Sequence, residues 1–476
     1  MPTPISLGVR SNQDRTTQAA QLINCYAESI GDEGKIQYPV YACDGYEAFS
    51  TLSGGGVTRG MLNLDDTWLY VVTGSRLFRV SPAGTANDMG AISTSGVAYM
   101  ARNRKSPNAQ VGICTSDGVF KIIENNSVSV PSLDSSIPTF NSICALDGYF
   151  IFTSANGEWF ITSIDEGSTI DPIEFAQANS NPDGAVRGIV RGRDLIIAGQ
   201  KSLEFYQNTG ATDFPFERTT STGTGVYAAP SMVNLTTGDG SDTVVFAGNN
   251  SNGDYAGVFM LQGYAAQKIS PFWLDRTISD ETSPSSIRAF TYARRGHTFY
   301  CITGTTFSAE FNATTSYWHR RKSSGLNVWR CAEAASFAGY TIFGDYTSGL
   351  LYKSRHDLTP ASASQIKVRK SRDGGNTWGS YRAKSVGASG ATTQRVRFNR
   401  LGQSKEDGHT FEITFSNAIV ENGTDTDMIV IPPSVNAWPS YQTIDTLYVD
   451  STPGSSQTNT SKGITGLGVD QETGST

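Results

Sequence analysis

Short apolar stretches recur along the chain in pairs, with a glycine-containing turn between the two members of each pair. The first pair is residues 69–72 and 77–80, with its turn at Gly74-Ser75. Later pairs are 111–114 with 119–122, 149–152 with 159–161, 195–197 with 203–206, 244–246 with 258–261, 299–302 with 307–311, and 340–343 with 350–352. Apolar runs of this length between turn residues are typical of buried strands, so each pair predicts a β-hairpin. Asp117-Gly118 and Asn156-Gly157 predict type I′ turns, which need positive φ.

The spacing of these hairpins indicates how they assemble. The turns fall near residues 74, 118, 157, 199, 250, 304 and 346, a mean step of about 45 residues, which matches the period of propeller blades. A lone four-stranded blade cannot bury both faces, whereas a closed ring of blades can. We therefore predict an all-β fold in which residues 56–358 form a six- or seven-bladed β-propeller. A pair of β-sandwiches with similar hairpin spacing is the alternative.

The segments outside the predicted ring differ from it in pattern. Residues 1–55 are polar and irregular and predict an extended N-terminal arm, which would close the ring with the last blade or clamp a neighbouring subunit. Residues 409–415 alternate like a half-buried strand and predict a small C-terminal β-domain over residues 359–432. Residues 433–476 are rich in Ser, Thr, Gly and Asn, so we expect a flexible tail, or one ordered only against a partner.

Composition agrees with an all-β protein. The 476 residues include 49 glycines, 11% are aromatic and only 17% are charged. No apolar run approaches the roughly 18 residues of a membrane span, and the first 15 residues lack the apolar region of a signal peptide. The cysteines are widely separated and predict buried thiols in a reduced compartment; they are Cys25, Cys43, Cys114, Cys144, Cys301 and Cys331.

Charge is distributed unevenly along the chain. Residues 365–405 carry ten basic residues against Asp373, a net +9, which leaves −16 for the remainder of a chain whose total is −7. Such a split often marks a docking surface for an acidic partner or nucleic acid. The alternative is an ordinary solvated face, because alternating strands spread these charges over two sides. The candidate docking residues are Lys367, Arg369, Lys370, Arg372, Arg382, Lys384, Arg395, Arg397 and Arg400.

One local motif lies inside this basic stretch. Residues 371–378 match the S-x-D-x-G-x-T-W "Asp box" at every position, through Ser371, Asp373, Gly375, Thr377 and Trp378. In this motif the Asp and Ser side chains hold the turn backbone, Gly provides the left-handed bend and Trp packs beneath. The motif is best known from sialidases and related propellers, where it lies away from the active site. It therefore predicts a structural hairpin.

Sequence signatures of catalysis are sparse, and we predict no catalytic residue, metal or cofactor. The histidines His297, His319, His356 and His409 are far apart and form no zinc motif. Nucleophile-elbow and phosphate-loop motifs are missing from the sequence. A sialidase-like glycosidase would need an arginine triad, a Tyr–Glu pair and an acidic Asp, and no local signature singles these out. A propeller glycosidase and a carbohydrate-binding, lectin-like propeller stay open as alternatives.

A family resemblance enters between residues 159 and 218. The residues that carry it are Trp159-Phe-Ile-Thr162, Phe175-Ala-Gln-Ala-Asn-Ser180, Pro182-Asp-Gly184, Arg193-Asp-Leu-Ile-Ile197, Ser202-Leu-Glu-Phe-Tyr206, Thr209-Gly-Ala-Thr212 and Pro215-Phe216. Together with Asn24-Cys-Tyr-Ala-Glu28, Gly45, Arg59-Gly60 and the Asp373-Gly-Gly375 turn, this pattern resembles the phage stabilisation family. These are the packaged-DNA-stabilisation, tail hub or nozzle proteins of short-tailed bacteriophages.

The resemblance implies a non-enzymatic virion protein of the phage tail, assembled in the host cytoplasm. It implies a homo-oligomeric ring, a hexamer, below the portal and its adaptor. That ring would extend the DNA channel, help retain packaged DNA and anchor needle, spike or fibre proteins. Double-stranded DNA would pass through an acidic lumen without specific binding, because like charge prevents sticking. The basic 365–405 region would dock on the adaptor or on an adjacent copy.

Overall fold

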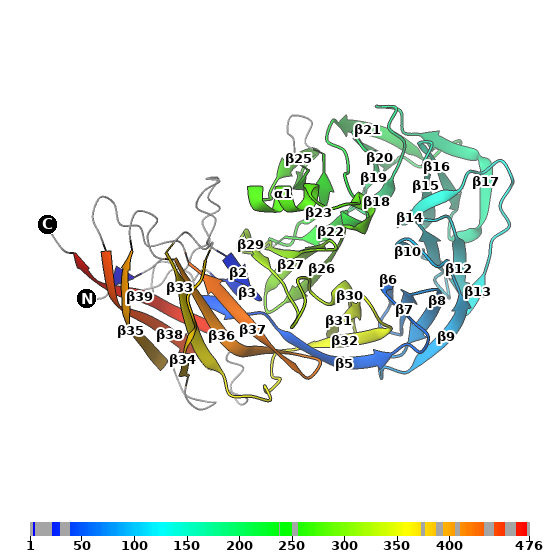
Figure 1. Ribbon diagram of the computed structural model, residues 1–476. Helices are drawn as coiled ribbons and strands as arrows, with labels where there is room; N and C mark the ends of the chain where they lie inside the picture. The colour runs from blue at the N-terminus through cyan, green and yellow to red at the C-terminus, as the bar shows by residue number, and fades with distance from the viewer. Residues whose placement is uncertain are drawn as a thin grey trace. The chain divides into compact units, whose positions relative to one another are not determined.

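The computed structural model describes residues 3–4, 21–28, 39–237, 239–249, 256–372, 377–386, 394–404, 410–432, 442–452 and 463–473. These residues form two compact units (Figure 1). The first, called the propeller unit, comprises Ala48–Thr306 and Arg330–Lys353. The second, called the flanking unit, comprises Met1–Glu47, Phe307–Trp329 and Ser354–Thr476. The flanking unit is thus assembled from three separate stretches of sequence.

Five complete four-stranded antiparallel sheets make up most of the propeller unit. Each follows chain order from an innermost to an outermost strand. The first two are β6 (Thr58–Leu64), β7 (Trp68–Thr73), β8 (Arg76–Val80), β9 (Ala86–Ala91) and β10 (Ala98–Arg102), β11 (Val111–Thr115), β12 (Phe120–Glu124), β13 (Ser127–Ser129). The third and fourth are β14 (Phe140–Leu146), β15 (Tyr149–Ser154), β16 (Glu158–Ser163), β17 (Glu166–Gln177) and β18 (Arg187–Arg191), β19 (Asp194–Ala198), β20 (Leu203–Asn208), β21 (Phe216–Thr222). The fifth is β22 (Val233–Thr236), β23 (Asp242–Gly248), β24 (Gly257–Gln262), β25 (Ala265–Lys268).

Two further blades complete the ring. The sixth begins with β26 (Arg288–Arg294) and β27 (His297–Thr303), and the seventh contains β30 (Cys331–Phe337), β31 (Tyr340–Asp345) and β32 (Leu350–Arg355). The innermost strands β6, β10, β14, β18, β22, β26 and β30 contact one another in this order, and β30 contacts β6 again. Within the described residues the propeller therefore has seven blades, which decides between the predicted six and seven (Figure 1).

The ring is closed by strands from the two ends of the propeller sequence. β5 (Gly45–Thr51) pairs with β32 at the outer side of the last blade. The Leu52 amide also donates to the Gly349 carbonyl at 2.7 Å. The segment before the first blade therefore completes the seventh blade, one of the two roles expected of the N-terminal arm.

The predicted hairpins form the two middle strands of successive blades, but the prediction of their turn type is wrong. At Asp117-Gly118 and Asn156-Gly157 only the glycine has positive φ, 98° and 91°. Type I′ needs two such residues, so these turns instead have the single left-handed glycine of a type I turn with a bulge. Pairs of positive-φ residues occur at other hairpins, such as Asp147-Gly148 between β14 and β15.

Apolar clusters between neighbouring blades hold the ring together. Phe120 of the second blade packs against Phe140 and Phe152 of the third, with ring centroids 6.2 and 4.6 Å apart. Further along the ring, Trp159 lies 4.9 Å from Tyr206 of the fourth blade and is fully buried. Because each cluster is shared by two sheets, no blade can bury its apolar faces without both neighbours.

The flanking unit contains two antiparallel-rich sheets. One includes β28 (Ser308–Asn312), β29 (Tyr317–Arg320), β2 (Gln21–Ile23), β37 (Thr424–Ile431), β36 (Thr410–Glu421), β33 (Gln365–Ser371) and β34 (Arg382–Ser385). The other has the order β3 (Cys25–Ala27), β4 (Val40–Ala42), β39 (Gly463–Thr473), β38 (Gln442–Thr452), β35 (Gln394–Ser404), with β1 (Thr3–Pro4) beside β39. The predicted alternation at 409–415 corresponds to β36, whose Phe411, Ile413 and Phe415 are buried.

The prediction of a flexible segment from residue 433 differs from the structure, which describes long paired strands β38 and β39 within it. Leu447, Val449, Ile464 and Leu467 are buried in these strands. Leu447 and Val449 lie two apart on one face of β38, whereas Ile464 and Leu467 lie three apart on β39, where the register of the β38–β39 pair shifts between Asp450 and Ser451. The many threonines favour extended backbone. The prediction missed these strands because it used the overall composition of residues 433–476, in which the few buried apolar residues are outnumbered by Ser, Thr, Gly and Asn.

The remaining features are few. The described residues include one α-helix, α1 (Phe272–Ser279), and two single 3-10 turns, η1 (Ala229–Ser231) and η2 (Pro284–Ser286). None of the described helices has the length and apolar character needed to cross a membrane. All six cysteines are buried free thiols, as predicted.

Candidate functional site

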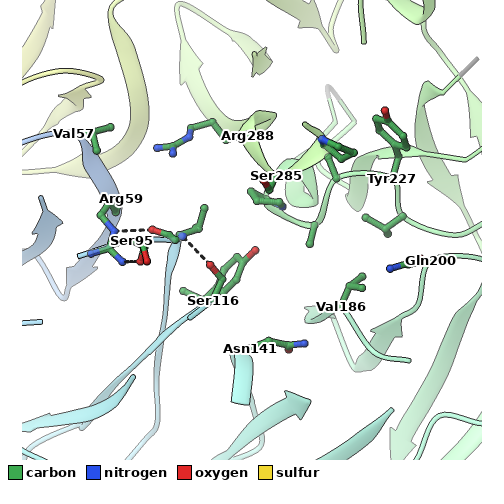
Figure 2. Close-up of a pocket in the computed structure, with 18 of the residues that line it drawn as sticks. Val57, Arg59, Ser95, Ser116, Asn141, Val186, Gln200, Tyr227, Ser285 and Arg288 are labelled. Atoms are coloured by element: carbon green, nitrogen blue, oxygen red, sulfur yellow. Dashed lines mark hydrogen bonds between the residues drawn. The ribbon is translucent and has the colours of Figure 1, made fainter. Parts of the chain in front are cut away.

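A cavity of about 690 Å³ lies among the inner ends of the blades in the propeller unit. Its lining comes from several blades and includes Arg59, Ser116, Asn141, Gln200 and Arg288 (Figure 2). The wall therefore mixes hydroxyl, amide and guanidinium groups with small apolar side chains. A cavity that combines apolar walls with a few polar groups is the usual form of a ligand-binding site, which makes this one the first candidate.

Arg59 is one of the charged residues that line this cavity, and its guanidinium donates hydrogen bonds to neighbouring backbone and side-chain groups. Its Nε donates to the Gly96 carbonyl at 2.6 Å and NH1 donates to the Gly74 carbonyl at 2.8 Å. It also bonds Ser93 and the Ser95 carbonyl; of these partners, Figure 2 draws Ser95. The side chain is 2% exposed, and burial lowers its pKa. Arg59 thus ties the start of the first blade to the segment leading into the second.

Two further arginines near the axis also donate to backbone carbonyls. Arg288 donates to the Thr58 carbonyl at 3.0 Å, and Arg187 donates to the Ala229 carbonyl at 2.9 Å. The Arg187 guanidinium also lies 4.4 Å from the centre of the Tyr99 ring. Burial raises the pKa of Glu333 to about 7, although the positive charge of Arg288 opposes this shift. Charges of both signs therefore meet at the axis.

These residue types invite comparison with the arginine triad and Tyr–Glu pair that a sialidase-like enzyme requires. The structure brings arginines, Tyr99 and Glu333 toward one region, but the bonds it shows for Arg59, Arg187 and Arg288 run to backbone carbonyls. Tyr99 is 6% exposed, and burial raises its pKa. The geometry supports a role in joining blades, since each arginine connects backbone from different parts of the ring.

The size of the cavity limits what can enter it. A sphere of 690 Å³ is about 11 Å across, narrower than the major groove of B-DNA alone, which is about 12 Å wide. The cavity can hold a small molecule or a side chain, but duplex DNA cannot pass through it.

The predicted basic residues all belong to the flanking unit, where the structure divides them between its two sheets. Lys367, Arg369 and Lys370 lie on β33, Arg382 and Lys384 on β34, and Arg395, Arg397 and Arg400 on β35, while Arg372 follows β33. The last six in chain order are exposed, and the three on β33 are partly buried; the exposed ones are Arg372, Arg382, Lys384, Arg395, Arg397 and Arg400.

The two groups of basic residues meet where β34 and β35 approach each other. Arg382 NH1 donates to the Asn399 carbonyl at 2.7 Å, and Lys384 Nζ lies 5.8 Å from the centre of the Phe398 ring. β33, β34 and β35 contain no Asp or Glu. The structure therefore gathers basic residues from three strands without acidic residues on those strands to offset them.

Arg369 differs from the other predicted docking residues because it has a partner within the unit. It makes two bonds to the Glu412 carboxylate, at 2.8 and 2.6 Å, and its guanidinium lies 5.0 Å from the Trp378 ring and 4.7 Å from the Tyr381 ring. The bonds to Glu412 raise the pKa of Arg369. This arrangement gives Arg369 a structural contact and makes it a weaker candidate for docking.

The Asp box is described only in part. Ser371 ends β33 and is buried, and Trp378 contacts Arg369. Asp373 and Gly375 lie outside the described residues, so the predicted turn geometry stays a prediction.

Several residues that carried the family resemblance have structural roles that sequence reasoning did not assign. Asn24 adopts a φ of 60°, and its side chain bonds the backbone of Lys322 and Asp427, which joins all three stretches of the flanking unit. A Cβ on Gly45 would lie 2.2 Å from the Val420 carbonyl oxygen, so only glycine permits the close approach.

Other residues that carried the family resemblance lie in the fourth blade and in the segment that precedes it. Glu204 is 1% exposed and accepts bonds from the Tyr206 hydroxyl at 2.6 Å and the Ser180 amide at 2.7 Å. Asp183 accepts bonds from the backbone of Lys201 and Ser202. The buried Glu204 and the partly buried Asp183 therefore fasten the segment between the third and fourth blades to the fourth blade.

Two of the comparisons with known proteins give either no match or only distant similarity. The search of curated proteins gives no match. Solved structures similar to the chain include a streptogramin B lyase (TM-score 0.45, 13% identity, covering 65% of this chain and 97% of that one) and the WD40 β-propeller domain of Doa1 (TM-score 0.38, 12% identity, 66% and 97%). A virginiamycin B lyase from Staphylococcus aureus has a TM-score of 0.44, 10% identity and coverage of 65% and 97%. Similarity this distant carries no functional argument.

The family comparison is more informative. Residues 1–358 match the phage stabilisation family model, described as the β-propeller of bacteriophage P22 Gp10. The match includes the N-terminal segment, every blade of the propeller and the residues Asn24, Arg59 and Glu204 discussed above. Because it covers well over half of the 476 residues, the chain belongs to the phage stabilisation family of bacteriophage β-propeller proteins.

Proposed function

We propose that this phage structural protein is a tail hub or nozzle subunit. Copies would form a ring, a hexamer, below the portal and its adaptor, extend the DNA channel, retain packaged DNA and anchor needle, spike or fibre proteins. Membership of the phage stabilisation family supports this role. The observation that carries it is the basic surface of the flanking unit, built from β33, β34 and β35 without an acidic residue on those strands.

The basic surface suits docking on an acidic protein. Arg382, Lys384 and Arg397 are exposed, and all three come from strands held in register within packed sheets. Surface charges fixed on a rigid scaffold steer association and set its orientation more than they add affinity. The partner would be the adaptor or an adjacent copy, since the remainder of this chain carries a net charge of −16.

The path of DNA follows from the cavity size. Because duplex DNA is too wide for the propeller cavity, the lumen would lie between copies, lined by the acidic remainder of the chain. An acidic or neutral wall lets phosphates slide, whereas a basic wall would hold them through counterion release. Placing the basic residues against other proteins and away from the lumen satisfies both requirements.

Assembly with the portal–adaptor complex provides the test. We expect the wild-type protein to join the complex as a ring in size analysis and in electron micrographs of native particles. The triple variant Arg382→Glu, Lys384→Glu, Arg397→Glu should lose incorporation at physiological salt. Lys201→Glu, an exposed charge reversal in the propeller unit, is the matched control and should assemble normally. Normal assembly of the triple variant would refute docking through this surface.

The location of the protein in the particle separates this role from sugar processing. A position at the head–tail vertex supports the hub, whereas a position at a fibre tip contradicts it. Turnover of a fluorogenic glycoside panel would indicate a glycosidase, and glycan-array binding without turnover would indicate a lectin. We expect neither, because the axial arginines bond backbone carbonyls.

A further inference from the structure

A cluster of buried polar side chains in the flanking unit has no part in the proposed docking. Cys43 precedes β5, Glu310 lies on β28 and His319 lies on β29, and they are 7%, 0% and 2% exposed. Their Sγ, carboxylate oxygen and ring nitrogen all lie within 4.8 Å of one another. Thiolate, carboxylate and imidazole are the three side-chain ligands that Zn²⁺ takes in proteins.

The local structure holds each of the three groups in place. Glu310 and His319 are directly opposite each other in the antiparallel pair β28–β29. The Cys43 amide donates to the Asn24 carbonyl at 3.0 Å, next to the site where Asn24 bonds the backbone of Lys322. The three donors are therefore positioned by backbone pairing before any ion binds, as a metal site requires.

The geometry at His319 favours a metal over a catalytic relay. Its Nε2 atom lies 2.7 Å from Glu310 Oε2 and 3.6 Å from Cys43 Sγ. A Cys–His–acid relay uses the two different ring nitrogens for nucleophile and acid, whereas here one nitrogen faces both groups. In a tetrahedral zinc site, bonds of about 2.0–2.3 Å place ligand atoms about 3.3–3.6 Å apart. The sulfur–nitrogen distance of 3.6 Å already fits, and the nitrogen–oxygen distance of 2.7 Å would have to open by about 0.6–0.9 Å.

Charge around the cluster points the same way. A buried carboxylate and thiolate need compensation, because isolated charges are strongly disfavoured in the interior. Arg321 lies 3.6 Å from Glu310 Oε2, but its guanidinium also stacks 4.0 Å from the Trp329 ring and faces Glu421 at 3.9 Å. Arg321 is therefore shared between Glu310 and Glu421, and a divalent ion held by Cys43, Glu310 and His319 would add positive charge beside Glu310.

We propose that Cys43, Glu310 and His319 bind one Zn²⁺ ion that fastens the N-terminal segment to the β28–β29 hairpin. The three ligands come from two of the three stretches that build the flanking unit, with Cys43 and His319 separated by 276 positions in sequence. A cross-link between segments far apart in sequence closes a long loop, so it removes more conformational entropy from the unfolded chain than a cross-link within one short segment would. The free energy of metal binding then adds to the free energy of folding. The three side chains leave the fourth tetrahedral position to a water molecule. The role proposed for the ion is to hold the two segments together, and it is independent of the tail role.

Elemental analysis of the full-length protein, purified without a polyhistidine tag, is the direct test. We expect about one zinc per chain after dialysis, and replacement with Co²⁺ should give a thiolate-to-metal charge-transfer band. Cys43→Ala and His319→Gln should lose the metal. Cys144→Ala, a buried thiol of the propeller unit, is the matched control and should keep it.

A second measurement keeps the test valid if those variants fail to fold. Removal of the ion from the wild-type protein with a chelator should lower its melting temperature, and Zn²⁺ but not Mg²⁺ should restore it. A folded wild-type protein that contains no stoichiometric metal and shows no sulfur-to-cobalt band after Co²⁺ addition would overturn the proposal. Equal metal loss in Cys144→Ala would also overturn it, because binding would then not depend on these three ligands.

Discussion

The closure of the propeller makes a quantitative prediction at Leu52. This residue is 2% exposed and packs in a cluster shared by the first blade, through Leu69 and Phe78, and the seventh, through Phe337 and Leu351. Truncation to alanine would leave a cavity between the first and last blades. The position therefore tests whether the ring is one cooperative unit or a row of independently stable sheets.

The expected cost lies toward the upper end for this kind of substitution. Leu→Ala in a core costs about 2–5 kcal/mol, and more when the surroundings cannot collapse into the space. At Leu52 the amide donates to the Gly349 carbonyl at 2.7 Å and the carbonyl accepts from the Gly55 amide at 3.0 Å. A backbone fixed at both ends cannot move to fill the cavity, so we expect a loss of about 3–5 kcal/mol.

Native-state hydrogen exchange followed by mass spectrometry can locate this loss. Exchange through global unfolding should accelerate by roughly 100-fold to several thousand-fold, since about 1.4 kcal/mol is tenfold. In a closed ring the slowest amides of β15, which lies in the third blade and therefore two blades from β6, must accelerate as much as those of β31. Ile173→Ala, at an 80% exposed position, should leave exchange unchanged. Acceleration confined to β31 would refute cooperative closure.

Three other substitutions test separate parts of the structure. Gly60→Ala should destabilise the propeller by about 1–3 kcal/mol or more in urea titrations, because its Cβ would lie 2.0 Å from the Ala98 carbonyl oxygen. Glu333→Gln should stabilise the protein at pH 8 but not at pH 4. Burial raises the pKa of Glu333 to about 7, so the native state holds a proton that the unfolded chain releases from about pH 4.5 upward, and folding becomes less favourable as the pH rises. Glutamine removes this dependence, and parallel urea titrations at the two pH values check it. Arg369→Met should cost about 1–3 kcal/mol in thermal denaturation, because it leaves the buried Glu412 carboxylate without its two charge-assisted bonds.

The propeller could be predicted because its information is local. In the sequence, each blade is recognisable by its two apolar middle strands on either side of a turn, such as β7 and β8 around Gly74, and these strand pairs recur at similar intervals along the chain. The edge strands carry weaker signals: in β17 the burial alternates only partly, and Ile173 is 80% exposed. Hairpin spacing left six and seven blades open, because the number of blades is fixed by the contact of β30 with β6 that closes the ring, and this contact joins segments far apart in sequence.

The flanking unit could not be predicted because its pairings are not local. β2 pairs antiparallel with β37 and parallel with β29, which joins segments hundreds of residues apart. A strand of three residues, such as β2 or β3, provides no periodicity to detect. Only single residues in the sequence point to these contacts. Asn24 adopts a positive φ and Gly45 permits a close approach of Val420, but neither role can be recognised without the segments that these residues contact.

The proposed zinc site of Cys43, Glu310 and His319 shows that chemistry is equally hard to predict from sequence. Motif searches detect ligands that lie a few residues apart on one element, as in H-E-x-x-H. Glu310 and His319 are nine positions apart and come together because the β28–β29 hairpin places them opposite each other. Cys43 lies 276 positions before His319 in the sequence. If a metal joins them, the ion and the β5–β32 pairing would fasten the same N-terminal segment at neighbouring points. Loss of the metal should then accelerate hydrogen exchange in β3 and β4 first, and the absence of such a change in metal-depleted protein would show that the segment is held by its sheet contacts alone.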